Sequence, residues 1–260
     1  MLVSVVTTVR DEARNISALL DSLVVQEPPL EIIVVDSASV DATRDIVRRY
    51  ERDYENVHLY ITGGTRGAGR NIGIRKAKGD AVAFIDGDAI ANPFWLKEIR
   101  EGLRRSDIVA GRTIQIGYRP FEELERVELI VEGTDVTYPS SNLAYRRSVL
   151  KEIGGFDEWF VTAEDIDLNI RAVRAGHTIA FRAGAIVYHR TRSSVYDFLR
   201  QALWNGAGRK QLTLKHGVLW SRYRPGRMLR QKTNFWSLLR LNTALLGYVG
   251  YKFFGKPLPP

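Results

Sequence analysis

Two aspartates on either side of a glycine are the residues of this sequence best suited to bind a metal ion. Asp86 and Asp88 close the apolar run of residues 81–85, and Gly87 permits an unusual backbone turn between them. Two carboxylates at this spacing can bind a divalent cation, which prefers oxygen ligands and often bridges to substrate phosphates. The structural alternative is a plain turn, for which Asp and Gly are equally typical. Asp36, at the end of another apolar run, favours the metal site.

Three carboxylates within four positions form a second candidate site. Glu164, Asp165 and Asp167 lie in the first turn of a predicted helix, where acidic side chains are favoured by the helix dipole. Asp167 can also pair with Arg171 one turn later, which is a structural role. A glycine-rich turn at 154–157 precedes the helix and could shape a pocket. Glu164 and Asp165 are therefore candidates for a general base and an acceptor contact.

A glycine-rich segment and a histidine could contact phosphates or a metal. Residues 63–71 include Arg66 and Arg70, and a helix N-terminus there could bind anions. The segment lacks the Gly-Lys-Ser/Thr ending of a Walker loop, so a flexible turn explains it equally well. His189 ends a further apolar run and is either a core histidine or a third ligand beside the two aspartates.

An alternation of strand and helix patterns must position these side chains. Buried strands are predicted at 3–9, 31–36, 57–61 and 81–85, with helices at 16–23 and 70–77. This order predicts a parallel α/β sheet, on which ligands bind at the carboxyl ends of the strands. Those ends carry Arg10 to Glu12, Asp36, and Asp86 to Asp88, so acidic groups converge on one edge.

The pattern is less regular beyond residue 107. Strands are predicted at 108–111, 140–145, 178–181 and 185–189, and helices at 120–132, 164–175 and 195–211. No internal repeat or low-complexity tract is present. The chain therefore predicts one α/β body with an appended C-terminal segment.

The charge is divided unevenly between these two parts. The 260 residues carry a net charge of +8, yet the first 197 hold 26 basic and 30 acidic residues. No acidic residue follows Asp197, whereas Lys and Arg occur there 12 times. A uniformly basic nucleic-acid binder would not show this division. The absence of cysteine excludes disulfides, thiol nucleophiles and cysteine zinc sites.

The C-terminal tail combines cations with an apolar stretch. Five basic residues at 222–232 precede an apolar segment that continues to Phe254 and is interrupted by Arg240 and Asn242. The part without a charged residue, 241–251, is too short to span a bilayer. It predicts an interfacial helix on an anionic membrane surface, with Trp236 and the tyrosines at the boundary. The alternative is a helix packed on the catalytic domain or in an oligomer interface.

Taken in order, these segments resemble a family 2 glycosyltransferase with the GT-A fold. The resemblance rests on five pieces in the family's order and spacing, which are residues 5–12, 36–43, 70–73, 84–88 and 154–168. It implies a Rossmann-like, mainly parallel sheet flanked by helices. The domain would span residues 1–215, and residues 216–260 would form a helical, membrane-seeking extension.

The resemblance also implies roles for individual residues. The nucleotide of a UDP- or GDP-sugar would be bound by Thr7, Arg10, Glu12, Asp36, Arg70 and Asp86. Mg²⁺ or Mn²⁺ on the diphosphate would be held by Asp88, with His189 completing the site. Asp165 would be the catalytic base and Glu164 its neighbour against the acceptor. Members of the family invert the anomeric carbon.

One departure from the family concerns chain-elongating synthases, which carry Gln-x-x-Arg-Trp after the base. Here residues 201–205 are Gln-Ala-Leu-Trp-Asn, which keeps only the glutamine of that motif and makes processive polymerisation doubtful. Arg200 and Arg209 are instead candidates to meet the diphosphate.

The expected activity is hexosyl transfer at the cytoplasmic face of a membrane. The acceptor would be a glycan hydroxyl or a lipid-linked phosphate, and no nucleic acid is expected as a partner. A sugar nucleotidyltransferase could share the α/β body and the metal, but it would need a glycine-rich basic loop directly after the first strand. A non-catalytic cationic membrane or nucleic-acid binder would explain the tail but not the carboxylates at the strand ends.

Overall fold

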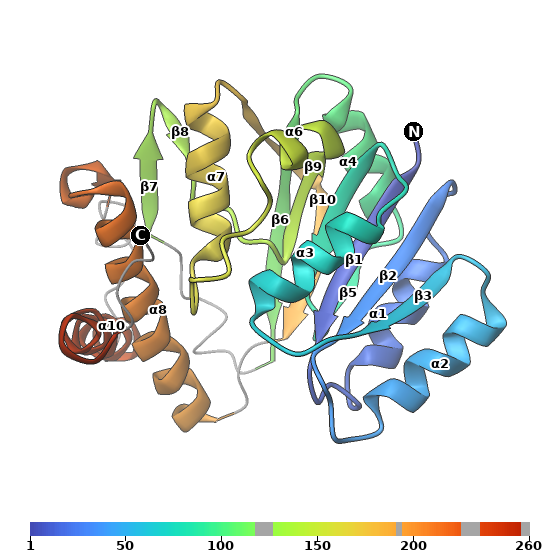
Figure 1. Ribbon diagram of the computed structural model, residues 1–260, viewed down its shortest axis with the longest axis horizontal. Coiled ribbons are helices and arrows are strands. Elements are labelled where there is room, and N and C mark those ends of the chain that lie inside the picture. Colours follow the sequence, from blue (N-terminus) through green and yellow to red (C-terminus); the bar gives the residue numbers. More distant parts are fainter. Residues whose placement is uncertain (118–126, 191–193, 225–234, 256–260) are drawn as a thin grey trace.

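A mixed eight-stranded sheet forms the centre of the protein (Figure 1). The computed structural model describes residues 1–117, 127–190, 194–224 and 235–255. The strand order is β3-β2-β1-β4-β9-β6-β10-β5. The bounds are β1 Val3–Val9, β2 Leu30–Asp36, β3 Val57–Ile61, β4 Ala81–Ile85, β5 Ala89–Ala91, β6 Ile108–Ile116, β9 Asn142–Arg146 and β10 Ile179–Arg190. Strands β1 to β4 pair in parallel, as predicted, while β9 runs antiparallel between β4 and β6.

Helices cover both faces of the sheet, which is why the central strands β1, β2 and β4 are buried along almost their whole length. On one face α1 (Ile16–Val24), α2 (Thr43–Asp53) and α4 (Trp95–Leu103) contribute to one buried apolar cluster. On the other face α3 (Arg66–Lys76), α6 (Arg147–Glu152) and α7 (Glu164–Arg174) pack against the second cluster. Val6 of β1 belongs to the second cluster, whereas Val3 and Val5 belong to the first, because successive side chains of a strand point to opposite faces of the sheet.

Several predicted boundaries differ from those in the structure. Helix α3 begins at Arg66, four residues before the prediction, because Thr65 caps it by accepting a hydrogen bond from the Ala68 N–H. The strands predicted at 178–181 and 185–189 are one strand, β10, whose pairing with β6 shifts between Arg182 and Ile186. The helix predicted over 120–132 is wrong for its last part, where β7 (Glu128–Val131) pairs with β8 (Thr134–Asp135). Residues 118–126 lie outside the described residues.

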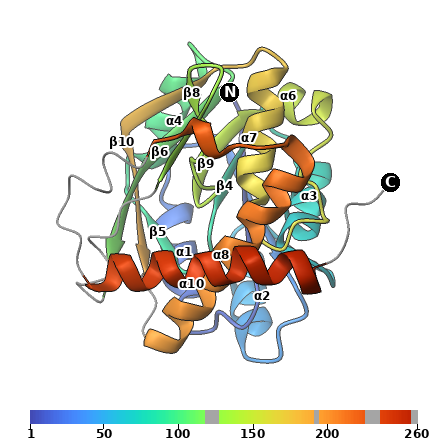
Figure 2. The ribbon, with the colours of Figure 1, turned by 90° about the vertical axis from the view of Figure 1, so that its left-hand side faces the viewer.

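Two long helices form the side of the molecule opposite β3 and α2 (Figure 1). Helix α8 (Val195–His216) ends next to the predicted domain boundary, and η1 (Trp220–Arg222) and β11 (Tyr223–Arg224) follow it. Helix α10 (Phe235–Phe254) crosses α8 (Figure 2). Among the described residues, no helix has the length and apolar character needed to cross a membrane. The basic residues Arg227, Arg230 and Lys232 of the predicted tail lie outside the described residues.

Candidate active site

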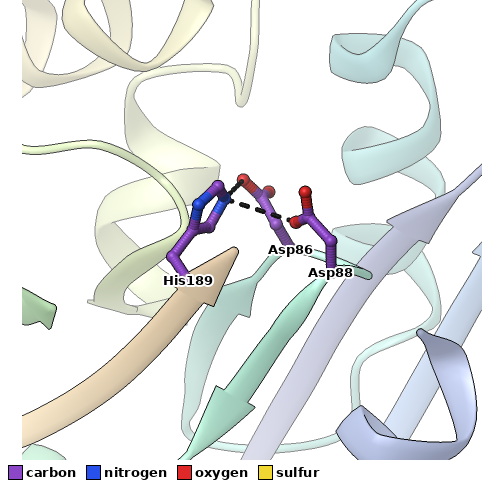
Figure 3. A group of neighbouring side chains, drawn as sticks. All are labelled: Asp86, Asp88 and His189. Atoms are coloured by element: carbon purple, nitrogen blue, oxygen red, sulfur yellow. Dashed lines mark ion pairs between the residues drawn. The ribbon is translucent and has the colours of Figure 1, made fainter. Parts of the chain in front are cut away.

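The two aspartates after β4 meet His189 at the end of β10 (Figure 3). His189 Nε2 lies 3.4 Å from Asp86 Oδ2 and 3.3 Å from Asp88 Oδ1. One ligand atom from each of the three residues lies within 4.8 Å of the others, so together they could hold a metal ion. The register of the sheet explains the meeting, because β5 pairs antiparallel with β10 and sets His189 opposite Ala89, the residue after Asp88.

Gly87 lets this turn pass close to the end of β1. A Cβ atom at Gly87 would lie 2.8 Å from Val9 Cγ1 and 3.3 Å from Glu12 Cγ. Any side chain there would push the aspartates away from the segment that follows β1. The glycine between the two carboxylates is therefore required by packing. Its φ lies outside the left-handed region, so the unusual backbone turn expected from the sequence is not the reason.

A buried arginine connects this cluster to the start of α7. Arg70 Nη2 lies 3.1 Å from Asp86 Oδ1, and Arg70 Nη1 lies 2.5 Å from Glu164 Oε1. The Arg70 side chain is 4% exposed, and its guanidinium also lies over the Phe156 ring, 5.4 Å from the centroid. Burial favours the neutral form of Arg70, but the charges of Glu164 and Asp86 outweigh it and raise the Arg70 pKa. Arg70 thus stays cationic and fixes two carboxylates that are 78 positions apart.

Small residues on α3 bring Arg70 to this place. A Cβ at Gly69 would lie 2.9 Å from Thr8 Cγ2, and a Cβ at Gly73 would collide with Val6. The two glycines therefore let α3 lie directly on β1. Gly69, in the glycine-rich segment, and Gly73 just after it thus form a close helix–strand contact that aims Arg70 at the strand ends.

Opposing effects act on the carboxyl group of Asp86. Burial alone would raise its pKa, but the hydrogen bond with His189 and the charges of Arg70 and His189 hold the Asp86 pKa below its usual range. Asp86 is consequently ionised, as a metal ligand or a structural anion must be.

Asp165 has the opposite electrostatic environment. Its Oδ2 accepts a hydrogen bond from the Ser140 N–H at 3.1 Å, and its Oδ1 accepts one from the Ile166 N–H at 2.8 Å. Burial and the adjacent charge of Glu164 raise the Asp165 pKa, although Arg70 lowers it. Ala163, two residues before Asp165 and directly before α7, has a φ of 65°, a strained value for a residue other than glycine. A carboxylate with a raised pKa at the edge of a site has the character of a general base.

A pocket of about 850 Å³ opens beside these groups. This volume lies in the range of small-molecule sites. Of the residues to which the resemblance assigns roles, Arg10, Glu12 and Asp88 line it, whereas Asp86, Glu164, Asp165 and His189 are not among its lining residues. Its other lining residues are Asp11, Arg14, Asn15, Arg66, Val161, Thr162, Arg190, Asp197, Arg200, Gln201, Trp204 and Asn205. Five arginines and four carboxylates line the wall, so the pocket offers contacts both to an anionic ligand and to a cation that accompanies it.

Thr7 and Asp36 lie beneath the pocket wall instead of on it. Both side chains are fully buried. Asp36 Oδ1 accepts hydrogen bonds from Arg44 Nε at 2.8 Å and from the Ser39 N–H at 2.9 Å. Thr7 Oγ1 and Asp36 Oδ2 have no hydrogen-bond partner among the described residues. The structure therefore places these two near the ends of β1 and β2 without giving either a direct opening to the pocket.

Sequence reasoning did not identify several residues of the pocket. Arg190 directly follows His189, so the end of an apolar run was a usable signal for it. Asp197, Gln201 and Trp204 share one face of α8 at helical spacing, but this face could not be assigned to the site without the tertiary structure. Arg200, proposed as a diphosphate contact, lines the pocket, whereas Arg209 instead lies over the Tyr223 ring.

Comparison with known families identifies the chain. Residues 4–154, more than half of the chain, match the glycosyl transferase family 2 model, and residues 81–255 match that of glycosyl transferase family group 2. The chain belongs to glycosyl transferase family 2. This membership confirms the resemblance inferred from the five sequence segments and favours it over a nucleotidyltransferase or a non-catalytic binder.

Two curated relatives match this chain over different shares of their own length. Glycosyltransferase AglE of Haloferax volcanii is 29% identical over 206 residues, which cover 73% of this chain and 67% of the relative. The pre-mycofactocin glycosyltransferase of Mycobacterium tuberculosis is 29% identical over 231 residues, covering 82% and 48%. This chain therefore spans two thirds of the first relative and about half of the second.

Solved structures confirm the predicted GT-A fold. Staphylococcus aureus TarS in complex with UDP superimposes with a TM-score of 0.61 at 26% identity, covering 80% of this chain and 65% of that one. Mannosyltransferase PcManGT from Pyrobaculum calidifontis, in complex with GDP-Man and Mn²⁺, has a TM-score of 0.68 at 21% identity, covering 98% and 76%.

Proposed function

We propose that this member of glycosyl transferase family 2 is an inverting hexosyltransferase that moves a sugar from a UDP- or GDP-sugar to a hydroxyl or lipid-phosphate acceptor. The observation that carries the proposal is the linked group Asp88–His189–Asp86–Arg70–Glu164 beside the pocket. It joins a cluster able to bind a cation to the carboxylates that begin α7.

The donor side of the proposal rests on charge and ligand type. Two carboxylates and an imidazole suit Mg²⁺ or Mn²⁺, and Asp88 and His189 would hold the ion. Once bound, such an ion would offset negative charge on the departing diphosphate. Arg10 and Glu12 line the pocket and would contact the nucleotide, with Thr7 and Asp36 supporting them from below. PcManGT binds GDP-Man and Mn²⁺, which is consistent with this assignment.

Asp165 is proposed as the base of a direct displacement. In its ionised form it would accept the proton of the acceptor hydroxyl while that oxygen attacks the anomeric carbon from the side opposite the diphosphate. Glu164, held by Arg70, would face the acceptor and keep the pKa of Asp165 raised. A single attack of this kind inverts the configuration at that carbon.

The acceptor side includes the membrane. The cationic, apolar C-terminal region supports a location at the cytoplasmic face of a membrane and a lipid-linked or glycan acceptor. A relative from Bacillus spizizenii, 34% identical over 167 residues, is a poly(ribitol-phosphate) beta-glucosyltransferase. Transfer to a phosphate-containing polymer or lipid is therefore the acceptor class that we would test first.

The decisive experiment is calorimetric titration with UDP- and GDP-sugars, with and without Mn²⁺. We expect Asp88→Ala to lose the Mn²⁺-dependent part of donor binding, because it removes a ligand of the ion. The matched control is Asp45→Ala, which removes an exposed carboxylate from α2. Unchanged Mn²⁺-dependent binding by folded Asp88→Ala would remove this residue from the metal site.

A further inference from the structure

Helix α10 exposes an apolar face that a single polar residue, the exposed Asn242, interrupts. Its outward residues recur at helical spacing and are each between 47% and 69% exposed. We call this surface the outer face of α10. It consists of Phe235, Leu238, Leu241, Leu245, Leu246, Val249 and Phe253. Soluble proteins rarely leave so many neighbouring apolar side chains in water, so the surface indicates a binding partner.

The opposite side of α10 is already occupied by α8 (Figure 2). A Cβ at Gly206 of α8 would collide with the Ala244 carbonyl oxygen, and a Cβ at Gly247 of α10 would collide with the Leu203 carbonyl oxygen. The two glycines therefore allow backbone-to-backbone contact between the helices. The described residues thus cover only one half of the α10 surface, and the other half, the outer face, stays exposed.

Charge identifies what covers the other half. Lys252 lies beside the outer face and is exposed, and Lys210 of α8 lies over the Tyr248 ring, 5.1 Å from its centroid. No acidic residue follows Asp197 in the sequence. A second copy of the chain docked about a two-fold axis would bring these cations near their own equivalents. An anionic surface would instead be attracted by them.

We infer that the outer face of α10 docks on the surface of a lipid bilayer carrying anionic headgroups. Leu241 and Leu245 lie within the seven-residue surface and enter the boundary between headgroups and acyl chains, while Lys252 contacts the headgroups. The helix lies along the bilayer surface because its other side remains against α8.

Docking in this way would set the position of the active site relative to the membrane. The residues of α8 that line the pocket, such as Gln201 and Trp204, lie on the opposite face of this helix from Gly206, which contacts α10. The α8 wall of the pocket is then held about 10 Å, one helix diameter, from the layer that carries α10. This part of the inference rests on the proposed function, since it explains access to a lipid-linked acceptor.

Vesicle flotation of the full chain tests the surface directly. The probes are vesicles of phosphatidylcholine alone and vesicles that also contain phosphatidylglycerol. We expect the wild type to float with the anionic vesicles and the double variant Leu241→Glu/Leu245→Glu to partition at least about tenfold less, because two leucines can no longer be buried in the lipid. The control is Val25→Glu, an equivalent change at a 67% exposed valine after α1, which should float as the wild type does.

Three results would overturn the inference. These are failure of the wild type to float with anionic vesicles, flotation of the double variant equal to that of the wild type, and a wild-type dimer in sedimentation velocity that the double variant abolishes without any vesicle binding. Nucleotide-sugar titration of the same proteins separates the two proposals. If the double variant still binds the donor but no longer floats, the result supports the outer face of α10 as the membrane-binding surface. If the wild type binds no nucleotide sugar, the result counts against the proposed function alone.

Discussion

Arg70 is the residue on which the geometry of the site most depends, because it is buried between two carboxylates from different parts of the chain. Its guanidinium contacts Asp86 and Glu164 through separate nitrogens. A planar fork can satisfy two carboxylates at once, which the single ammonium of lysine cannot do in the same way. The arginine thus fixes the distance between the cation cluster and the start of α7.

We therefore expect Arg70→Lys to impair both stability and transfer. Leaving part of a buried carboxylate pair uncompensated should cost about 3 kcal/mol of unfolding free energy, and kcat should fall by at least about tenfold as Glu164 moves. Urea unfolding and steady-state kinetics measure the two effects. Arg75→Lys, an exposed change on the same helix, is the control and should alter neither. Wild-type kinetics in Arg70→Lys would show that the link is not needed for transfer.

The raised pKa of Asp165 predicts the acidic limb of the pH profile. A base works only when ionised, so kcat/KM should fall as the pH drops through the Asp165 pKa, which lies above the ordinary value of 3.8. Burial is the main cause and the charge of Glu164 the next. In Glu164→Gln this second cause is removed, so the limb should move to lower pH. A limb that stays in place in that variant would argue against Asp165 as the titrating group.

At this scale the sequence predicted where the candidate side chains lie better than it predicted their connections. Asp86, Asp88 and His189 were recognisable because each follows an apolar run that ends at one edge of a sheet. The pairing of Arg70 with Glu164 could not be predicted, since 94 positions separate them and only the packing of α3 on β1 brings them together. Thr7 and Asp36 were expected to contact the nucleotide, but both side chains are buried. A position at the end of a strand does not specify whether a side chain opens to the pocket.

At the scale of elements, the contact between α8 and α10 depends on the absence of two side chains. Gly206→Ala would place a methyl group on the backbone of α10. We expect this change to lower the midpoint of thermal unfolding, although alanine is the better helix former. Gly250→Ala is the matched control on α10, where a Cβ has no neighbour within 4 Å, and it should raise the midpoint slightly through helix propensity. Equal behaviour of the two variants would contradict the close contact.

Helices and strands were predictable wherever the apolar residues followed a single helical or strand period. The strands at 57–61 and 81–85 match their predictions because each is a short, mainly apolar run, although only the second is buried along its whole length. The prediction at 120–132 failed for 128–131, where the alternating burial of β7 belongs to a small sheet with β8 and β11. Such a strand has only four residues, too few for a period of two to outweigh a helical pattern read across a longer window.

At the scale of the whole molecule, buried charges make stability depend on pH. Asp167 is fully buried and lies 2.9 Å from Arg171 Nε, 2.9 Å from Lys215 Nζ and 2.8 Å from His216 Nε2. Burial acts to raise its pKa, but the hydrogen bond with His216 and the charge of Arg171 lead the effects that lower the Asp167 pKa to about 2. The Asp167 carboxylate thus links α7 to the end of α8. In the unfolded chain this carboxylate would become protonated at a higher pH than it does in the folded protein.

A folded-state pKa below the unfolded value means stability that is present above about pH 4 and lost as the pH falls towards 2. We expect Asp167→Asn to lower the unfolding free energy by about 2 kcal/mol at pH 7 and by much less near pH 2. Urea unfolding at the two pH values measures the difference. Asp45→Asn, at an exposed carboxylate, should show no such dependence. A loss that is equal at both pH values would assign it to packing.

The sheet order has a consequence for any attempt to divide this protein. Strand β4, which delivers Asp86 and Asp88, is flanked by β1 on one edge and by β9 on the other, and β9 begins only at Asn142. A fragment ending before β9 would leave the edge of β4 open to solvent and to self-association. It would also leave the Arg70 guanidinium without its partner Glu164. The segment that carries Asp86 and Asp88 is therefore no module that can be excised, and any shortened protein made for crystallography or screening should extend beyond α7.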